Sequence, residues 1–309
     1  MVPEMKIFET AKLRKATALI AADRYKTAKT IPTVFHFEPC LFETAGRRMQ
    51  TVEIKHASID GKDIYLLDNF FSAQETSAMQ TFSQQAAFSR DIFGSAESIG
   101  KGQRPARSMN SQEKWEFFSH PPEAVEAIYQ WFCWLSVRLD AEISTFPWDL
   151  CHQDISSPAI ATNRVDAQSA ECMEMGKHRD VDPERGLAFG LSALYGQGHH
   201  LEPFANGAPG KPWLVSVMLY TTDENFSPAY GMGTVFCNEQ KETVFRAECR
   251  SMRLVLFAGD IIHSIEESRL PLGSSSGRVS YVFKLAINPR RTDQCVKELF
   301  SQLVSSFSS

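Results

Sequence analysis

The chain has 309 residues, and its 32 Lys and Arg against 37 Asp and Glu give a formal charge of −5 and a pI of about 5.9. A hydrophobic content of 43%, a charged content of 22% and a mean hydropathy of −0.24 are typical of a globular protein, and they exclude the disordered, collagenous and membrane-embedded classes. The acidic balance also argues against bulk electrostatic attraction to nucleic acid.

The cysteines and the N-terminal composition indicate a compartment. There are 7 cysteines, an odd number without any Cys-x-x-Cys pair, so we expect reduced thiols and neither a disulfide framework nor a zinc ribbon. Residues 1–26 interrupt their apolar runs with charges, unlike a signal peptide or a membrane-spanning helix. We therefore expect a cytoplasmic protein without a membrane segment.

Two elements are predicted in the first part of the chain. Apolar residues at helical spacing, Leu13, Ala16 and Leu19 among them, predict one amphipathic helix over residues 8–28. This helix ends before Pro32. No partner for it can be inferred from the pattern.

A strand and two helices are then predicted before residue 155. A short strand over residues 63–67 precedes Ser72 and Glu75, whose spacing forms a capping box that starts a helix running to about residue 88. Residues 88–119 are aperiodic and predict a loop with brief structure. After Pro121 and Pro122, apolar residues recur every three or four positions and predict a core-facing helix.

The pattern changes after about residue 155, where short β-rich runs alternate with Gly, Pro and Asp. These runs cover residues 158–165, 213–221, 233–237, 243–247, 253–257, 261–265 and 278–287, and a closing helix follows over 293–307. Many short strands predict a mainly β fold with a helical buttress, as a sandwich or barrel, and not a parallel sheet. We expect residues 1–60 to form an N-terminal helical or extended segment and residues 61–309 to form one compact unit.

The tripeptide His178-Arg179-Asp180 is the sharpest chemical signal in the chain. In an extended segment His178 and Asp180 point to the same side, whereas Arg179 points away. His263 follows the run 253–257 and a short turn, so we expect it on the next strand of a β hairpin. Two imidazoles and one carboxylate on one face of an octahedral ion leave three open positions, which favours non-haem Fe(II) over structural zinc.

The predicted strand 277–287 has two different faces. Its odd-numbered residues from position 279 onward are apolar, whereas Arg278, Ser280 and Lys284 lie on the opposite face. An arginine turned into a barrel is costly unless it binds an anion, and a planar guanidinium matches a carboxylate through two hydrogen bonds. Arg278 is therefore the expected carboxylate anchor, and Lys284 is the second candidate.

Together, His178-x-Asp180, His263 and Arg278-x-Ser280 resemble the signature of the 2-oxoglutarate- and Fe(II)-dependent dioxygenases. The segments between these motifs are similar, in order, to successive strands of the prolyl-4-hydroxylase-like branch; they are residues 213–223, 231–236 and 253–263. The resemblance covers roughly residues 158–288, and the strand and helix over 63–88 resemble the usual entry to this branch. The segment 181–212 and the interval from His263 to Arg278 are longer than is usual there.

The resemblance implies a fold and a metal. The fold is a double-stranded β-helix, that is, a jelly-roll or cupin-like barrel over about residues 158–288, packed on N-terminal helices. The metal is Fe(II), held by His178, Asp180 and His263. Both imidazoles must be neutral to bind, so we expect iron affinity to fall as the pH drops through their titration range. Because Asp180 serves as a ligand, no place is left for a halide, and hydroxylation or oxidative demethylation is favoured over halogenation.

The resemblance also implies a cosubstrate, 2-oxoglutarate, whose keto acid end binds the iron. Its distal carboxylate is expected at Arg278, with help from Ser280 and Tyr220. The charges of Fe(II), Asp180, Arg278 and the 2-oxoglutarate dianion then cancel, which a dry pocket tolerates. With O2, this chemistry releases succinate and CO2 and hydroxylates a substrate.

Other interpretations stay open at this point. A barrel of this shape also suits a cupin-like metal-binding sensor or an isomerase without oxygenase activity. Tyr220 could equally be a core aromatic residue whose hydroxyl meets a backbone carbonyl. His199 and His200, within the segment 181–212, fit a solvated loop or a lid over the site better than a second metal site.

The motifs do not identify the substrate, which we expect to be a protein side chain, an amino acid or a small metabolite. The acidic pI disfavours nucleic acid, although Arg90, Arg104 and Arg107 could form a local basic patch. Selectivity is expected in the loops 181–212 and 90–119, because loops on a rigid barrel vary most. The sequence does not predict the oligomeric state.

Overall fold

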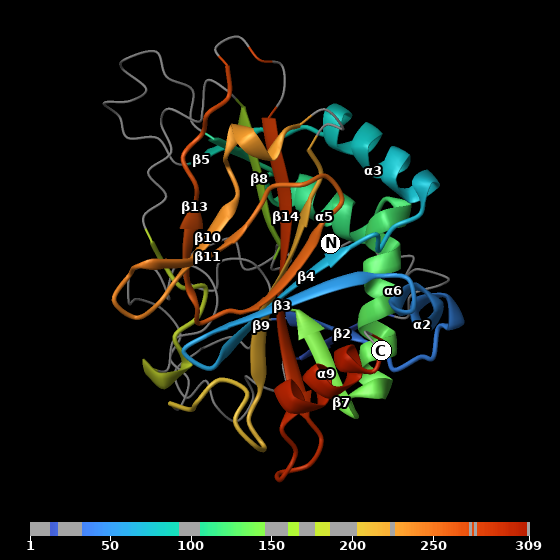
Figure 1. Cartoon of the computed structure of the whole chain (residues 1–309). Coiled ribbons are helices and arrows are strands. Elements are labelled where there is room, and N and C mark those ends of the chain that lie inside the picture. The colour runs from blue at the N-terminus through green and yellow to red at the C-terminus, as the bar shows by residue number, and fades with distance from the viewer. Residues whose placement is uncertain are drawn as a thin grey trace.

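The computed structural model describes residues 13–17, 33–92, 106–145, 160–166, 177–185, 203–222, 226–271, 274 and 277–307. These residues form a mainly antiparallel β fold in three layers, made of helices, a large sheet and a small sheet (Figure 1). The expectation of a β-rich fold with helices is confirmed.

The large sheet has 11 strands, and its main path runs β1-β2-β7-β14-β9-β12-β4-β3. Strand β8 pairs with β14 and with β6, which in turn pairs with β5. The strands are β1 (Leu13–Thr17), β2 (Thr33–Phe37), β3 (Glu53–Ile59), β4 (Lys62–Asp68), β5 (Arg90–Ile92), β6 (Ala106–Ser108), β7 (Ala141–Thr145), β8 (Ile160–Asp166), β9 (Trp213–Tyr220), β12 (Leu254–Ala258) and β14 (Gly277–Pro289). At the centre, β14 pairs with β9 along one edge and with β8 and β7 along the other.

The small sheet has the order β11-β10-β13, made of β10 (Thr234–Cys237), β11 (Thr243–Ala247) and β13 (Ile262–Ile265). The expected hairpin between the runs 253–257 and 261–265 is wrong, because β12 and β13 lie in different sheets. Strand β12 already pairs with β4 on one edge and β9 on the other, so neither edge is left for β13. The chain therefore crosses from one sheet to the other at Gly259 and Asp260.

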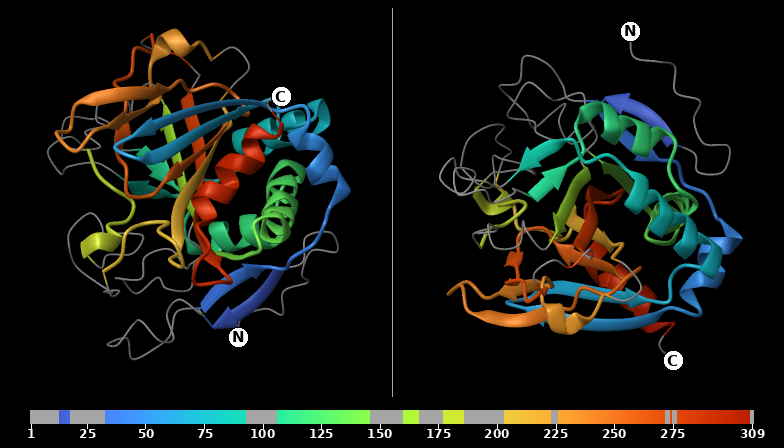
Figure 2. Two further views of the ribbon diagram at one scale, coloured as in Figure 1. Left: turned by 60° about the horizontal axis from the view of Figure 1, so that its bottom comes forward. Right: turned by 90° about the horizontal axis from the view of Figure 1, so that it is seen from above.

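Five helices are described: α2 (Glu43–Met49), α3 (Ala73–Gln85), α5 (Ser111–Ser119), α6 (Glu123–Arg138) and α9 (Val296–Ser305). They gather on the side of the large sheet away from β10, β11 and β13 (Figures 1 and 2). Helix α3 begins at Ser72, where the expected capping box with Glu75 is present. Helix α6 is buried along most of its length, which confirms the core-facing helix after Pro122.

The large sheet has a core on each face. On the helical face, residues such as Tyr281, Phe283 and Leu285 pack with α6. On the other face, Met218 and Val282 pack with apolar residues of the small sheet. The alternation expected for the strand 277–287 is confirmed, and it turns Arg278, Ser280 and Lys284 into the space between the two sheets, where all three are buried.

Two other expectations need correction. Residues 13–17, expected within a helix over 8–28, form strand β1, because β2 offers them an edge in antiparallel register; the rest of 8–28 lies outside the described residues. Residues 111–119, within the segment expected as a loop with brief structure, form the full helix α5, where Asn110 and Glu113 make a second capping box.

None of the helices in the described ranges combines the length and apolarity needed to span a bilayer. The described cysteines carry free thiols, and four of them are buried: Cys133, Cys237, Cys249 and Cys295. Cys151 and Cys172 lie outside the described residues.

Candidate metal centre

His178 and His263 are brought together by their backbones. The amide of His178 donates to the carbonyl of His263 over 2.9 Å, and the amide of His263 donates back over 2.8 Å. This bridge places the segment around His178 on the edge of β13 that β10 leaves free, because β10 pairs with His263 from the other side. The two imidazole rings consequently lie 4.4 Å apart between centroids.

Asp180 completes a group of three ligand residues. Its amide donates to the carbonyl of Gly259 over 2.9 Å, in the crossing from β12 to β13. Asp180 Oδ1 lies 4.0 Å from His178 Nε2, and Oδ2 lies 3.8 Å from His263 Nε2. Within the described part of the chain, no other set of three His, Cys, Asp or Glu residues brings its ligand atoms within 4.8 Å of one another. Two imidazole nitrogens and one carboxylate fit a divalent transition metal with open positions.

The tautomer of His263 suits metal binding. Its Nδ1 lies 2.9 Å from the carbonyl oxygen of Ile261, which accepts only if Nδ1 carries the proton. The lone pair is thereby left on Nε2, the atom that faces Asp180. Phe257 packs edge-on against the ring at 4.9 Å and keeps this side of the site apolar.

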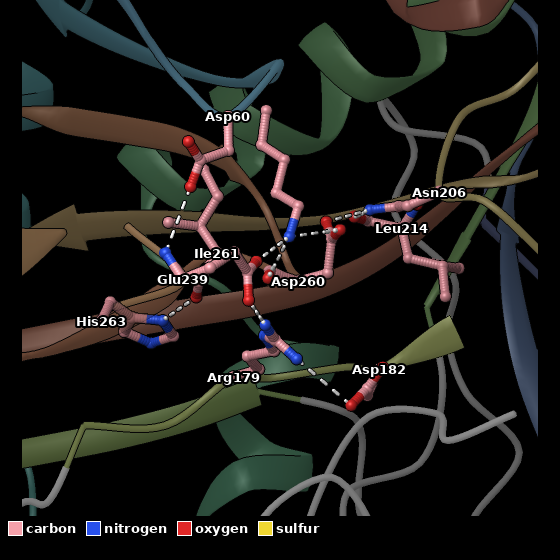
Figure 3. Close-up of polar contacts among 10 residues, drawn as sticks. Asp60, Arg179, Asp182, Asn206, Leu214, Glu239, Asp260, Ile261 and His263 are labelled. Atoms are coloured by element: carbon pink, nitrogen blue, oxygen red, sulfur yellow. Dashed lines mark hydrogen bonds and ion pairs between the residues drawn. The ribbon is translucent and has the colours of Figure 1, made fainter. Parts of the chain in front are cut away.

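Charged side chains tie the ligand-bearing segments to the rest of the fold (Figure 3). Arg179, between the two ligands in the sequence, pairs with Asp182 and Glu239. Lys62 donates to Glu239 over 2.8 Å and lies 3.3 Å from Asp260, beside the crossing that leads to His263. The sequence predicted that Arg179 would project away from His178 and Asp180. Its ion pair with Glu239 connects the His-x-Asp segment to the turn after β10.

A buried lysine adjoins the ligand carboxylate. Lys284 Nζ pairs with Asp180 Oδ2, and Ser216 Oγ donates to the same oxygen over 2.6 Å. Ser216 and Lys284 are cross-strand partners on β9 and β14, and Nζ lies 3.3 Å from Ser216 Oγ. The lysine side chain is only 4% exposed, so its ammonium cannot reach solvent. Sequence reasoning missed this pairing, although Ser216 is the one polar residue in the apolar run Trp213–Tyr220.

The electrostatics of the site keep Asp180 ionised. Burial alone would raise the pKa of Asp180, but Lys284, His263 and His178 together hold that pKa well below its usual range. Burial lowers the pKa of Lys284, and Asp180 opposes that shift. Burial also lowers the pKa of His263 to about 3, with His178 acting in the same direction. The His263 imidazole is therefore neutral, and able to bind a metal, well below the ordinary titration range of histidine.

Arg278 lies on the same face of β14 as Lys284, but it has no carboxylate partner among the described residues. Its Nη2 contacts the weak acceptor Met218 Sδ at 3.5 Å, and its carbon Cζ lies 5.2 Å from the ring centroid of Tyr220. Nε and Nη1 are buried and make no hydrogen bond to any described residue. Ser280 Oγ is likewise buried without a partner there. Buried groups without partners are costly, and an acceptor-rich anion is the kind of ligand that would satisfy these three atoms.

Tyr220 supports this site through its ring. Its hydroxyl lies 2.7 Å from Thr234 Oγ1, and no backbone carbonyl is its partner among the described contacts. Burial raises the pKa of Tyr220, while Arg278 acts in the opposite direction. The phenol is therefore neutral, and its face lies against the guanidinium as a cation–π contact.

The remaining sequence candidates lie elsewhere. His199, His200 and Arg104 are outside the described residues, as is most of the segment 181–212. His56 is on β3 and pairs with Asp63 at 2.9 Å on the surface. Arg107 lies opposite Arg164, where β6 pairs with β8.

No family model matches the chain. No curated protein matches it either. Among solved structures, it is similar to a prolyl 4-hydroxylase from Phytophthora capsici, with 14% identity and a TM-score of 0.30 over 80% of this chain and 69% of that one. It is also similar to a prolyl 4-hydroxylase from Pseudomonas putida, with 11% identity and a TM-score of 0.30 over 81% of this chain and 100% of that one. Scores this low carry no argument, so the function is inferred from the site itself.

Proposed function

We propose that the chain is an Fe(II)- and 2-oxoglutarate-dependent oxygenase of the prolyl-4-hydroxylase-like branch. Its substrate would be a protein side chain, an amino acid or a small metabolite, which it would hydroxylate. The observation that carries the proposal is that His178, Asp180 and His263 converge beside Lys284 of β14, the strand that also carries Arg278, a buried guanidinium with no carboxylate partner among the described residues. A metal site beside the strand face that carries such a guanidinium suits a function in which an anionic cosubstrate binds with the metal.

The residues would divide the work as follows. His178 and His263 bind the metal through neutral nitrogens, and Asp180 adds one anionic oxygen. Arg278 and Ser280 would offer three polar atoms without described partners to the distal carboxylate. The ring of Tyr220 contacts the guanidinium and would orient it. When bound, Fe(II) with 2-oxoglutarate and O2 supplies oxidation of a C–H bond, with release of succinate and CO2. The protein supplies orientation and the exclusion of water.

Lys284 changes the charge balance expected from the sequence. A divalent ion with Asp180, Arg278 and Lys284 carries three net positive charges, and the 2-oxoglutarate dianion leaves one. With the extra positive charge of Lys284, the site therefore favours a doubly charged cosubstrate more strongly than it would if Arg278 were its only cationic side chain.

Other parts of the proposal concern architecture and location. We assign the facing sheets to a double-stranded β-helix, with a barrel core over about residues 158–288 within a domain of residues 61–309. The two-sheet arrangement around His263, with His178 bridged to the edge of β13, supports this assignment. The cytoplasm remains the compartment that we propose, because the described cysteines are free thiols.

The test is a screen of candidate substrates scored by succinate release, with Fe(II), O2 and 2-oxoglutarate present. We expect release only when all three are supplied, and we expect His178→Ala to abolish it. His56→Ala is the matched control, because His56 is a surface histidine on β3.

Two results would contradict the proposal. Succinate release that persists in His178→Ala would show that the reaction does not depend on this metal centre. Tight metal binding with no metal-dependent binding of 2-oxoglutarate would instead favour the cupin-like sensor or isomerase.

A further inference from the structure

We propose that Lys284 is the counterion of Asp180 before metal binds, and that its charge lowers the affinity of the site for metal until an anionic cosubstrate binds as well. Lys284 would thus be a positioning residue that couples the two binding events. The inference rests on the proposed metal centre, and it goes beyond a role for Lys284 as carboxylate anchor.

The first step is geometric. Lys284 and Ser216 both contact Oδ2 of Asp180, whereas Oδ1 faces His178 Nε2 at 4.0 Å. The cross-strand pairing of β9 with β14 fixes both partners of Oδ2. A metal held by the three ligands would therefore have the ammonium as a close neighbour, and burial gives the ammonium no route to solvent.

The second step is electrostatic. Ser216 and Lys284 orient the same carboxylate oxygen, and partners that orient a ligand ordinarily strengthen metal binding. Lys284 differs because its ammonium brings a positive charge beside a divalent cation, among side chains that are about nine-tenths buried, where Coulomb repulsion is strong. Lys284 also competes with the metal for the negative charge of the Asp180 carboxylate. The repulsion exceeds the benefit of one hydrogen bond, so the net effect of Lys284 on metal affinity is negative.

The third step concerns the cosubstrate. With the metal bound, Asp180 would be the single negative charge at the site, whereas the metal, Lys284 and Arg278 are all positive. A dicarboxylate offsets most of that excess, so each ligand raises the affinity for the other, and by the same factor. Removing the charge of Lys284 weakens this reciprocal effect.

The experiment measures Mn(II) binding to the metal-free full chain, with and without saturating 2-oxoglutarate. Lys284→Gln keeps a hydrogen-bond donor but removes the charge, whereas the matched Ser216→Ala removes a donor to the same oxygen without changing charge. We expect Lys284→Gln to bind Mn(II) about tenfold or more tightly than the wild type, and Ser216→Ala to bind it about tenfold more weakly. We also expect 2-oxoglutarate to raise Mn(II) affinity by a larger factor in the wild type than in Lys284→Gln.

A second measurement guards against a folding defect. Lys284→Gln leaves Asp180 without its counterion, so the metal-free variant should have a lower Tm than the wild type, and Mn(II) should raise that Tm by more. Lys284→Met, which also removes the charge, serves if the glutamine variant does not fold.

The outcomes separate the inference from the proposed function. If both Lys284→Gln and Ser216→Ala weaken Mn(II) binding, Lys284 only orients Asp180 and the inference is overturned, while the metal centre stands. If Lys284→Gln binds Mn(II) but the wild type does not bind it even with saturating 2-oxoglutarate, the charge effect of Lys284 holds and the proposed oxygenase function fails. If no variant binds Mn(II) better than His178→Ala does, both fail.

Discussion

Two buried arginines in the large sheet meet different surroundings. Arg253, just before β12, is 2% exposed and makes hydrogen bonds of 2.7 and 2.6 Å to the two carboxylate oxygens of Asp68. Arg278, on β14, is also 2% exposed, yet it has no carboxylate among the described residues. The fold thus satisfies a buried guanidinium where its role is structural. In our proposal, the carboxylate of the cosubstrate satisfies the second guanidinium, that of Arg278.

The largest expected effect concerns ligand affinity. Arg278→Met should weaken 2-oxoglutarate binding to the metal-loaded protein by roughly 100-fold or more, because losing a buried charged partner costs about 3 kcal/mol or more. Calorimetric titration measures this directly. Arg253→Lys is the control, since it retains a cation for Asp68 and should leave the affinity unchanged. Equal losses of 2-oxoglutarate affinity in the two variants would contradict the different roles assigned to the two arginines.

Stability should respond in the opposite order. Arg253→Met leaves Asp68 without its partner and should lower the free energy of unfolding by roughly 3 kcal/mol. Arg278→Met removes an unpaired buried charge and should leave the ligand-free protein as stable as the wild type, or more stable by on the order of 1 kcal/mol. Denaturant unfolding of both variants provides the comparison. A marked loss in Arg278→Met would mean that Arg278 has a structural partner.

The pH dependence of stability extends the comparison to His263 on β13, which belongs to the same group as Asp180. The pKa of His263 is lowered to about 3 from 6.5, so the unfolded chain binds its proton first as the pH falls. The metal-free protein should therefore lose about 1.5 kcal/mol from this residue between about pH 6.5 and pH 5. Denaturant unfolding at several pH values measures the slope, which should flatten in His263→Asn and persist in His56→Asn. An unchanged slope in His263→Asn would exclude His263 as its source.

The smallest effect is expected at Ser280. Its hydroxyl has no described partner, so Ser280→Ala should leave the unfolding free energy within about 0.5 kcal/mol of the wild type. It should weaken 2-oxoglutarate binding by roughly tenfold, the worth of one hydrogen bond to a charged group. Titration of the variant gives both the sign and the size. An unchanged affinity would place the carboxylate on Arg278 alone.

The sequence predicted the strands after residue 155 well, because short apolar runs between turn residues carry a local signal. It also predicted that His178 and Asp180 share a side, and that Arg278, Ser280 and Lys284 share a face, since both follow from the two-residue period of a strand. The odd-numbered apolar residues between Arg278 and Lys284 pack with the helices, in the core on the opposite face of β14.

What local patterns could not predict was pairing. The segment 13–17 reads as helix but is a strand because β2 offers it an edge. The hairpin expected before His263 is a crossing between sheets, because β4 and β9 occupy both edges of β12. The contact between Lys284 and Asp180 joins segments far apart in the chain, and no spacing rule links them. Helix α5 was detectable, because Asn110 and Glu113 have capping-box spacing.

The central claim is that a metal held by His178, Asp180 and His263 and a carboxylate held by Arg278 belong to one site. Anaerobic titration of 2-oxoglutarate into the Fe(II)-loaded protein, the metal-free protein and Fe(II)-loaded Arg278→Met tests it most directly. The account predicts tight binding only in the first of the three. Equal affinity with and without the metal, or with and without Arg278, would contradict it.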